Sequence, residues 1–115
     1  MPTHRKNKDY NPYNCPVTHT MNRIGGKWKV LIIYAISKDC NRFSRLQKVM
    51  PLISKQMLVN QLRELEADGI LQRIIYPEVP PKVEYRLTDR ARDLMPVIAA
   101  MQAWGLEDIQ TKTAR

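Results

Sequence analysis

The sequence has few cysteines and histidines and no long apolar run, and these shortages exclude several classes of protein. Its 115 residues include two cysteines, Cys15 and Cys40, and two histidines, without the short repeated spacings of metal ligands. Neither a disulfide framework nor a zinc site is therefore expected, and no metal is assigned. No segment approaches the roughly 18 apolar residues of a membrane-spanning helix. No hydrophobic signal core follows the basic N-terminus, so we expect a soluble, cytoplasmic protein without a membrane partner.

The sequence also lacks glycine-rich and other catalytic motifs, and this argues against an enzyme. The chain has four glycines, and the one adjacent pair, Gly25-Gly26, lacks the flanking residues of a phosphate-binding loop or a nucleophile elbow. No other cluster with catalytic spacing is present. The sequence therefore favours a binding function, with no cofactor.

Acidic residues are rare in the first part of the chain. Residues 1–48 hold ten Lys or Arg against Asp9 and Asp39, whereas residues 49–115 hold nine of each sign, so the net charge of +8 arises in the first part. A basic segment attracts polyanions by counterion release, but it does not choose among DNA, RNA and an anionic membrane. The length and the 43% apolar content fit one small domain.

Residues 54–68 have the pattern of a helix with one apolar and one polar side. Leu58, Leu62 and Leu65 lie four and three residues apart, so they share one face, and Ser54 precedes them as an N-cap. Amides and guanidinium groups on the opposite side can form paired hydrogen bonds with bases in the major groove. An ordinary amphipathic surface helix would show the same pattern. The polar side and its flanks carry Lys55, Gln56, Val59, Asn60, Gln61 and Arg63.

Two strands with a proline-rich tip are expected after this helix. Residues 71–76 are rich in β-branched and aromatic side chains, and residues 82–87 alternate between apolar and charged. Three of the five residues at 77–81 are prolines, which cannot continue a strand ladder. A recognition helix followed by such a hairpin, or wing, indicates duplex DNA binding, although a hairpin that only closes a core looks similar. The wing leaves Arg73, Lys82 and Arg86 available to contact a phosphate or to enter a minor groove, and Glu78 at the tip weakens this electrostatic argument.

The residues before the recognition helix predict its partner in a helix-turn-helix pair. A short helix is expected over residues 44–49, with Leu46 and Val49 facing inward, and Pro51 closes it. A short edge strand is expected just before it, at residues 41–43. Two basic residues of this segment, Arg42 and Arg45, are assigned to DNA phosphates.

Further helices are expected on both sides of this pair. Pro16 begins one that Gly25-Gly26 ends, and residues 28–36 are apolar nearly all round, as in a central buried helix. Thr88 caps a long C-terminal helix, which Pro96 should kink. The expected fold is α+β and mainly α, a winged helix-turn-helix domain with a two-stranded wing and extra terminal dimerisation helices. The domain covers residues 15–108, after a basic flexible arm at 1–14 and before a tail at 109–115.

The terminal helices carry more apolar side chains than one small core needs. A symmetric homodimer would bury the excess. One recognition helix also covers few base pairs, so the dimer should bind an inverted repeat of duplex DNA. The expected interface consists of Val17, Met21, Ile24, Leu94, Ile98, Met101 and Trp104.

Four sequence blocks carry a family resemblance. They are Cys-Pro at 15–16, Gly-Gly-Lys-Trp at 25–28, Leu-Arg-Glu-Leu-Glu-x-Asp-Gly at 62–69 and Tyr-Pro-x-x-Pro-Pro at 76–81. In this order and spacing the chain, from about Cys15 to Gly105, resembles the HxlR-type helix-turn-helix regulators of bacteria. The resemblance implies a winged helix related to the MarR regulators and a homodimer that binds an inverted repeat. By the family pattern the recognition helix carries Ser54, Lys55, Gln56, Asn60 and Gln61, with Arg42 near the backbone and Lys82 on the wing.

Cys15 has two interpretations. Some regulators that this chain resembles sense oxidants or electrophiles through a cysteine just ahead of the first helix, and a helix N-terminus favours the thiolate. Alternatively, Cys15 is a buried structural residue, as free cysteines often are. Cys40, on an expected loop, could pair with Cys15 only if a dimer brought their Cα atoms within about 7 Å.

The remaining alternative is an RNA-binding or architectural DNA protein. Such a protein would share the basic charge, but it usually presents stacking aromatics or inserted apolar wedges rather than amides on a helix. Neither an effector nor a target gene follows from the sequence.

Overall fold

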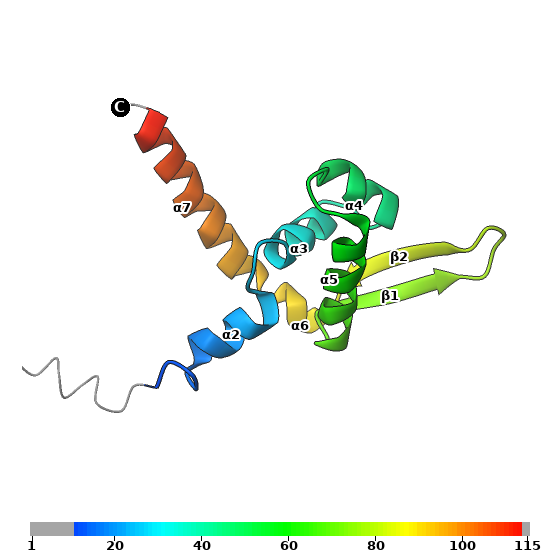
Figure 1. The fold of residues 1–115 in the computed structure, drawn as a ribbon, viewed down its shortest axis with the longest axis horizontal. Helices are drawn as coiled ribbons and strands as arrows, with labels where there is room; N and C mark the ends of the chain where they lie inside the picture. The colour runs from blue at the N-terminus through cyan, green and yellow to red at the C-terminus, as the bar shows by residue number, and fades with distance from the viewer. Residues whose placement is uncertain (1–10, 114–115) are drawn as a thin grey trace, which may run out of the picture.

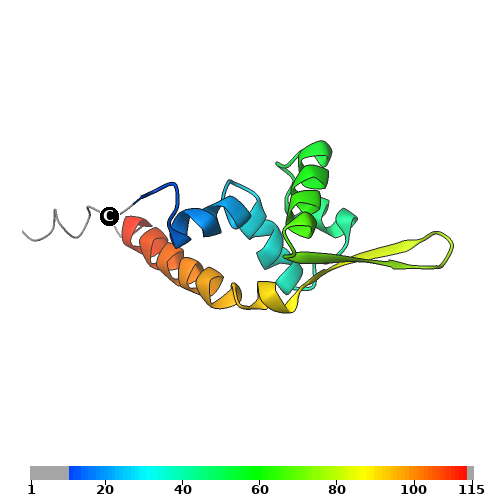
Figure 2. The ribbon, with the colours of Figure 1, turned by 90° about the horizontal axis from the view of Figure 1, so that it is seen from below.

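The computed structural model describes residues 11–113, which form helices and one two-stranded sheet. Along the chain the elements are α2 (Pro16–Ile24), α3 (Lys29–Ser37), α4 (Phe43–Val49), α5 (Lys55–Ala67), β1 (Leu71–Tyr76), β2 (Lys82–Leu87), α6 (Asp89–Arg92) and α7 (Met95–Thr113). Helices α3, α4 and α5 lie together at the centre, the hairpin extends to one side, and α2 and α7 extend to the other (Figures 1 and 2). This arrangement is a winged helix-turn-helix, and it confirms the expected α+β, mainly α fold.

The core lies where α3, α4, α5 and the base of the wing meet. Its completely buried side chains include Ile32 and Ile33 of α3, Leu46 of α4, and Leu58 and Leu65 of α5. The leucine row of α5 therefore faces inward, as its spacing predicts, which leaves the other side of the helix to solvent. Burial is incomplete on α3, because Leu31 is 48% exposed.

Helix α5 begins and ends at the expected residues. The Ser54 hydroxyl accepts a hydrogen bond from the Met57 amide at 3.0 Å, which caps the first turn. Gly69 follows the last turn with φ of +74°, a left-handed conformation that glycine adopts without a Cβ clash. The recognition helix is thus defined at both ends by local sequence.

The two strands pair antiparallel, as expected of a hairpin. Leu71 lies opposite Leu87 at the base, and Tyr76 lies opposite Lys82 near the tip. Side chains alternate between the two faces of the hairpin. Arg73 and Tyr85 therefore point to the α5 side, whereas Glu84, Lys82 and Arg86 share the other face.

Two expectations around α4 are wrong. Residues 41–43 do not form a strand, because Arg42 is the N-cap residue of α4 and Phe43 already belongs to that helix. Asn41 contacts β2 through its carbonyl, 2.9 Å from the Tyr85 amide, and through its side chain, which donates to Glu84. Val49 is 51% exposed, while the next residue, Met50, is buried. Since α4 ends at Val49, the chain turns there and Met50 takes the inward position.

The C-terminal region also differs from the expected single kinked helix. Thr88 caps a helix as expected, with its hydroxyl 3.2 Å from the Ala91 amide, but that helix ends at Arg92. Pro96 does not kink a continuous helix, because it lies in the first turn of α7, where a missing N–H breaks no hydrogen bond. Helix α7 then continues to Thr113, so it includes residues 109–113 of the segment expected as a C-terminal tail at 109–115.

The expected basic arm lies mostly outside the described residues. Only residues 11–14 of it are described, and they form turns ahead of α2.

Candidate nucleic-acid interface

The solvent side of α5 carries the side chains assigned to base reading. Lys55, Gln56, Asn60 and Arg63 are exposed there. The Gln56 Nε2 donates to Asn60 Oδ1 at 3.0 Å, so the two amides lie one turn apart and are joined. This bond leaves an acceptor oxygen on Gln56 and an NH₂ group on Asn60, which is the complement of an adenine edge in the major groove.

Two other residues of the predicted set lie differently. Gln61 is half-buried, with its Nε2 3.5 Å from the Met57 sulfur, so it lies beside the base-reading face. The Ser54 side chain is exposed but already caps α5. Gln61 and Ser54 therefore lie at the edge of the base-reading surface.

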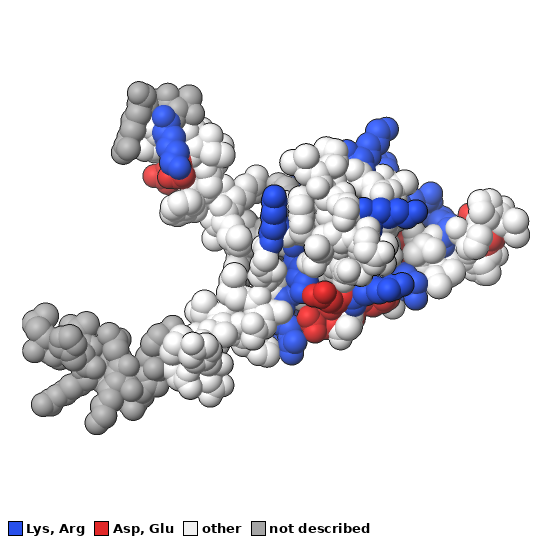
Figure 3. Space-filling model, in the orientation of Figure 1, with Lys and Arg blue, Asp and Glu red and all other residues white. Residues whose placement is uncertain are grey.

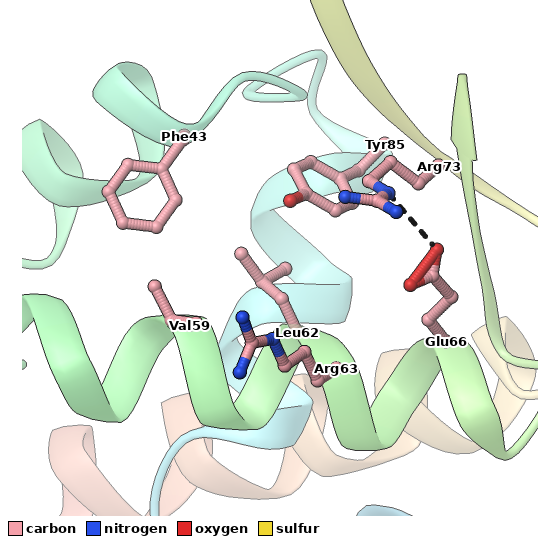
Figure 4. A pocket seen from close by; sticks show the side chains of 7 residues that line it. All are labelled: Phe43, Val59, Leu62, Arg63, Glu66, Arg73 and Tyr85. Carbon is pink, nitrogen blue, oxygen red and sulfur yellow. Dashed lines mark ion pairs between the residues drawn. The ribbon is translucent and has the colours of Figure 1, made fainter. Parts of the chain in front are cut away.

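Val59 lies in a hollow of about 120 Å³ between α4, α5 and the wing, rather than on the open face. Figure 4 shows Phe43 and Val59 at one end of this hollow and the Arg73–Glu66 pair at the other. One helical residue is a rotation of about 100°, so Val59 flanks the buried leucine row instead of opposing it. Burial raises the pKa of the Tyr85 phenol, which also lines the hollow.

Opposite charges divide α5 along its length. The acidic residues of its C-terminal part each pair with a basic residue of another element: Glu64 with Lys29 at 2.8 Å, Glu66 with Arg73 at 3.5 Å, and the C-cap Asp68 with Arg23 at 3.2 Å. In Figure 3 one group of acidic atoms lies at the centre of the molecule with basic atoms beside it, others lie on the wing and on α7, and further basic side chains project around α4 and α5. The acidic end therefore anchors the helix, and the N-terminal end presents positive charge.

Basic residues on α4 extend this positive surface. Arg42, at the N-cap, and Arg45 are exposed and form no ion pair within residues 11–113. Lys48 is exposed as well, one turn after Arg45 on the same face. Lys48 was missed from sequence, although its spacing of three from Arg45 was the available signal.

The wing holds its basic side chains in contacts of their own. Arg73, assigned to phosphate, is partnered by Glu66, so it ties the wing to α5. Lys82 Nζ lies 5.0 Å from the centre of the Tyr76 ring and 4.0 Å from Glu84 Oε1, and Arg86 donates to the Tyr76 hydroxyl at 2.7 Å. A hydrogen bond with Tyr76 holds the pKa of Glu84 below its usual range, and the same bond raises the pKa of Tyr76.

A family model decides the class of this chain. The model of HxlR-like helix-turn-helix proteins matches residues 23–113. The chain belongs to this family.

The relatives of this HxlR-like chain are transcriptional regulators. It is 46% identical over 101 residues to the HTH-type transcriptional regulator YybR of Bacillus subtilis, covering 88% of this chain and 81% of that one. Among solved structures, redox regulator HypR in its oxidized form is 48% identical, with a TM-score of 0.76, over 81% of this chain and 96% of HypR. A regulator of the MarR family from Porphyromonas gingivalis is 35% identical, with a TM-score of 0.75, over 87% of this chain and 98% of the other. The chain is thus a helix-turn-helix transcriptional regulator by family, and its relatives are not enzymes.

The residues expected at a dimer interface of this HxlR-like protein separate into two groups. Ile24 and Ile98 are 4% and 3% exposed within one chain, so both pack in its core, and Ile24 also lines a groove between α2, α3 and α7. Leu94 packs against the same core. The exposed members are Val17, Met21, Met101 and Trp104, which are 71%, 56%, 51% and 71% exposed.

A groove between α2, α3 and α7 contains most of this exposed apolar surface. It measures about 540 Å³, and Val17, Met21, Val30, Leu31, Val97 and Met101 line it. Exposed contiguous apolar surface of this kind usually marks an interaction site.

Cys15 is the N-cap of α2. Its sulfur accepts a hydrogen bond from the Thr18 amide at 3.4 Å and lies 3.2 Å from the Thr18 hydroxyl. Cys15 is half-buried, and Cys40 lies on the loop between α3 and α4, as expected, where it is half-buried against the core. No disulfide joins these two residues.

Within residues 11–113 no helix is long and apolar enough to cross a membrane. The same part of the chain contains no group of three or more His, Cys, Asp or Glu residues that could hold a metal ion.

Proposed function

We propose that this regulator binds a specific duplex DNA sequence through α5, as a homodimer on an inverted repeat. The observation that carries the proposal is the exposed Gln56–Asn60 pair, which leaves one donor and one acceptor directed to solvent from a helix anchored at its other end. Three ion pairs and the buried leucines hold α5 in place, so the helix loses little conformational entropy when it enters a major groove. We further propose that the protein acts in the cytoplasm.

Phosphate contacts come from the elements on both sides of α5. Arg42 is the N-cap residue of α4, Arg45 lies on that helix, and Lys82 lies on the wing. These residues would contact the duplex backbone on each side of the groove that α5 enters. The N-terminus of α5 adds the positive end of its dipole, next to Lys55.

Filter binding tests the class of ligand directly. Duplex DNA, single-stranded DNA and single-stranded RNA of the same sequence are compared at one salt concentration. The proposal expects the duplex to bind best. Equal or stronger retention of the RNA would favour the alternative of a non-specific RNA-binding or architectural protein.

Salt dependence tests the phosphate residues. Replacing Arg42, Arg45 or Lys82 with Ala should each lower the slope of log affinity against log salt by roughly one unit, with the sequence preference kept. Lys112→Ala on α7 is the matched control, because Lys112 pairs with Asp108 far along the terminal helix. If none of the three substitutions changes the salt slope, these residues do not contact phosphates in the interface.

The apolar groove supports the dimer. A second copy would cover the exposed faces of α2 and α7, which lie on the side opposite the wing (Figure 1). Both recognition helices would then remain free on the other side, as a two-fold inverted repeat requires.

A response to oxidants through Cys15 is the second proposal, and one comparison favours it. HypR is a redox regulator by its title, and it covers 81% of this chain at 48% identity. Cys15 caps the helix that supplies Val17 and Met21 to the groove, so a modified sulfur would lose the Thr18 contact and shift α2. A shifted dimer helix would change the spacing between the two recognition helices.

The test compares DNA binding with and without diamide, which removes two electrons and two protons from a pair of thiols as they form a disulfide. Wild type should lose affinity, Cys15→Ser should not respond, and Cys40→Ser should respond as wild type does. If wild type and Cys15→Ser respond alike, Cys15 is a structural cap and any signal enters elsewhere.

A further inference from the structure

Glu84 is an acidic residue in the middle of a surface proposed to bind phosphates. The wing has a second acidic residue, Glu78, at its tip. Glu78 is exposed, and its carboxylate makes no ion pair or hydrogen bond within residues 11–113. The Glu84 side chain is only 16% exposed. A carboxylate near DNA weakens binding because it repels the phosphates. The position of Glu84 on this surface is therefore not explained by a direct contact with DNA.

The carboxylate of Glu84 joins three parts of the molecule. Its Oε2 accepts a hydrogen bond from Asn41 Nδ2 at 3.0 Å, and its Oε1 lies 4.0 Å from Lys82 Nζ. The Lys82 ammonium in turn lies over the ring of Tyr76, on the other strand, at 5.0 Å. Glu84 therefore links β2 to the segment between α3 and α4, and through Lys82 it is connected to β1.

Asn41 is fixed to the wing twice. Besides the side-chain bond to Glu84, its carbonyl accepts from the Tyr85 amide at 2.9 Å. The next residue is Arg42, the N-cap of α4. The place where α4 begins, and with it the backbone of Arg42, is thus set relative to Lys82 on the wing.

We propose that Glu84 is a positioning residue for DNA binding, which holds the wing against the start of α4 so that Lys82 and Arg42 meet the backbone of one duplex. The inference rests on the proposed function. Glu84 touches no DNA itself in this proposal; it acts through Asn41 and Lys82.

The proposal reverses the effect expected from charge alone. Glu84→Ala and Glu78→Ala each remove one negative charge from the wing, so electrostatics predicts tighter DNA binding for both. Positioning predicts that Glu84→Ala weakens binding by roughly three- to tenfold, the range of a typical net hydrogen bond. Glu78→Ala is the matched control and should bind as well as wild type or better.

The measurement is fluorescence anisotropy with a labelled random-sequence duplex spanning several helical turns, titrated at several salt concentrations. Phosphate contacts do not depend on sequence, so an identified operator is not needed. Glu84→Ala should lower the salt slope by roughly one unit as Lys82 or Arg42 loses its phosphate. A merely destabilised protein would lose active fraction without a change of slope.

A second variant, Asn41→Ala, distinguishes loss of positioning from loss of folding. Asn41→Ala removes the donor and leaves the Glu84 charge in place. It should weaken binding to a similar extent, and the double variant should be less affected than the sum of the two single effects. If wild type binds the duplex but Glu84→Ala behaves as Glu78→Ala does, or Asn41→Ala has no effect, the positioning role is wrong and the proposed function stands. If wild type binds no duplex, both fail.

Discussion

Gln56 and Asn60 are the side chains on which base reading depends in the proposed function. Replacing Asn60 with Ala should cost about 1 to 3 kcal/mol at the specific site, because a paired contact with one base is lost. Binding to random duplexes should change little. The check is a titration of both duplexes with wild type and variant.

A uniform loss on both duplexes would contradict the base-reading role of Asn60. Gln61→Ala serves as a control on the same helix, since Gln61 is half-buried beside Met57 and should cost less.

Glu84 also gives a prediction in pH. Its pKa is depressed in the folded protein, first by the hydrogen bond with Tyr76 and further by Lys82, Arg86 and Asn41. A depressed carboxyl pKa contributes stability that is present above the unfolded pKa of about 4.3 and is lost as the pH falls through the folded value. The melting temperature of Glu84→Ala should therefore lie below that of wild type at neutral pH, and the gap should close in acid.

The gap is measured by thermal unfolding from pH 7 down to about pH 3, below the ordinary glutamate value. Glu78→Ala, with no contact to lose, should show no such gap. A gap for Glu84→Ala that stays constant over this range would mean that its ionised form makes no stabilising contact.

Among the elements, α5 and the wing were predictable from sequence and several contacts between elements were not. The leucine spacing fixes which side of α5 is buried, and Ser54 and Gly69 fix its ends, all within one local segment. The Asn41–Glu84 bond joins residues 43 positions apart, and no local pattern encodes it. The Arg73–Glu66 pair likewise depends on how the wing folds back on α5.

Boundaries were predicted less well where two signals competed. Pro96 was expected to kink a long helix, yet its ring is tolerated in a first turn, so a break at residues 93–94 is the lower-energy solution. Val49 and Met50 are both apolar neighbours, and only the end of α4 decides which one is buried.

The left-handed conformation of Gly69 ends α5. Gly69 has φ of +74°, so Gly69→Ala should destabilise the protein by about 1 kcal/mol. Gly105 lies inside α7 with open space around its Cβ position, so Gly105→Ala should stabilise by about 0.5 to 1 kcal/mol. Urea unfolding of the two variants measures both changes; a stabilising effect at residue 69 would contradict the left-handed helix stop.

For the whole molecule, the exposed apolar side chains of α2 and α7 imply the proposed dimer. Trp104→Glu should raise the dimer dissociation constant at least about tenfold, because an unpaired carboxylate would be buried between the subunits. Gln102→Glu adds the same charge to an exposed polar position of α7 and is the control. Sedimentation at micromolar concentration measures the dimer dissociation constant. A wild-type protein that is monomeric at this concentration would contradict the proposed dimer.

Selection of binding sites from a pool of random duplexes tests base reading and symmetry together. Two recognition helices in a symmetric dimer should lie about 34 to 36 Å apart, or a multiple of that, along the duplex. The enriched sequences should therefore form an inverted repeat with half-site centres one helical turn, or whole turns, apart, and Asn60→Ala should lose the enrichment. A pool that shows no preferred sequence, or a single half-site bound as tightly as a repeat, would contradict sequence-specific binding by a dimer.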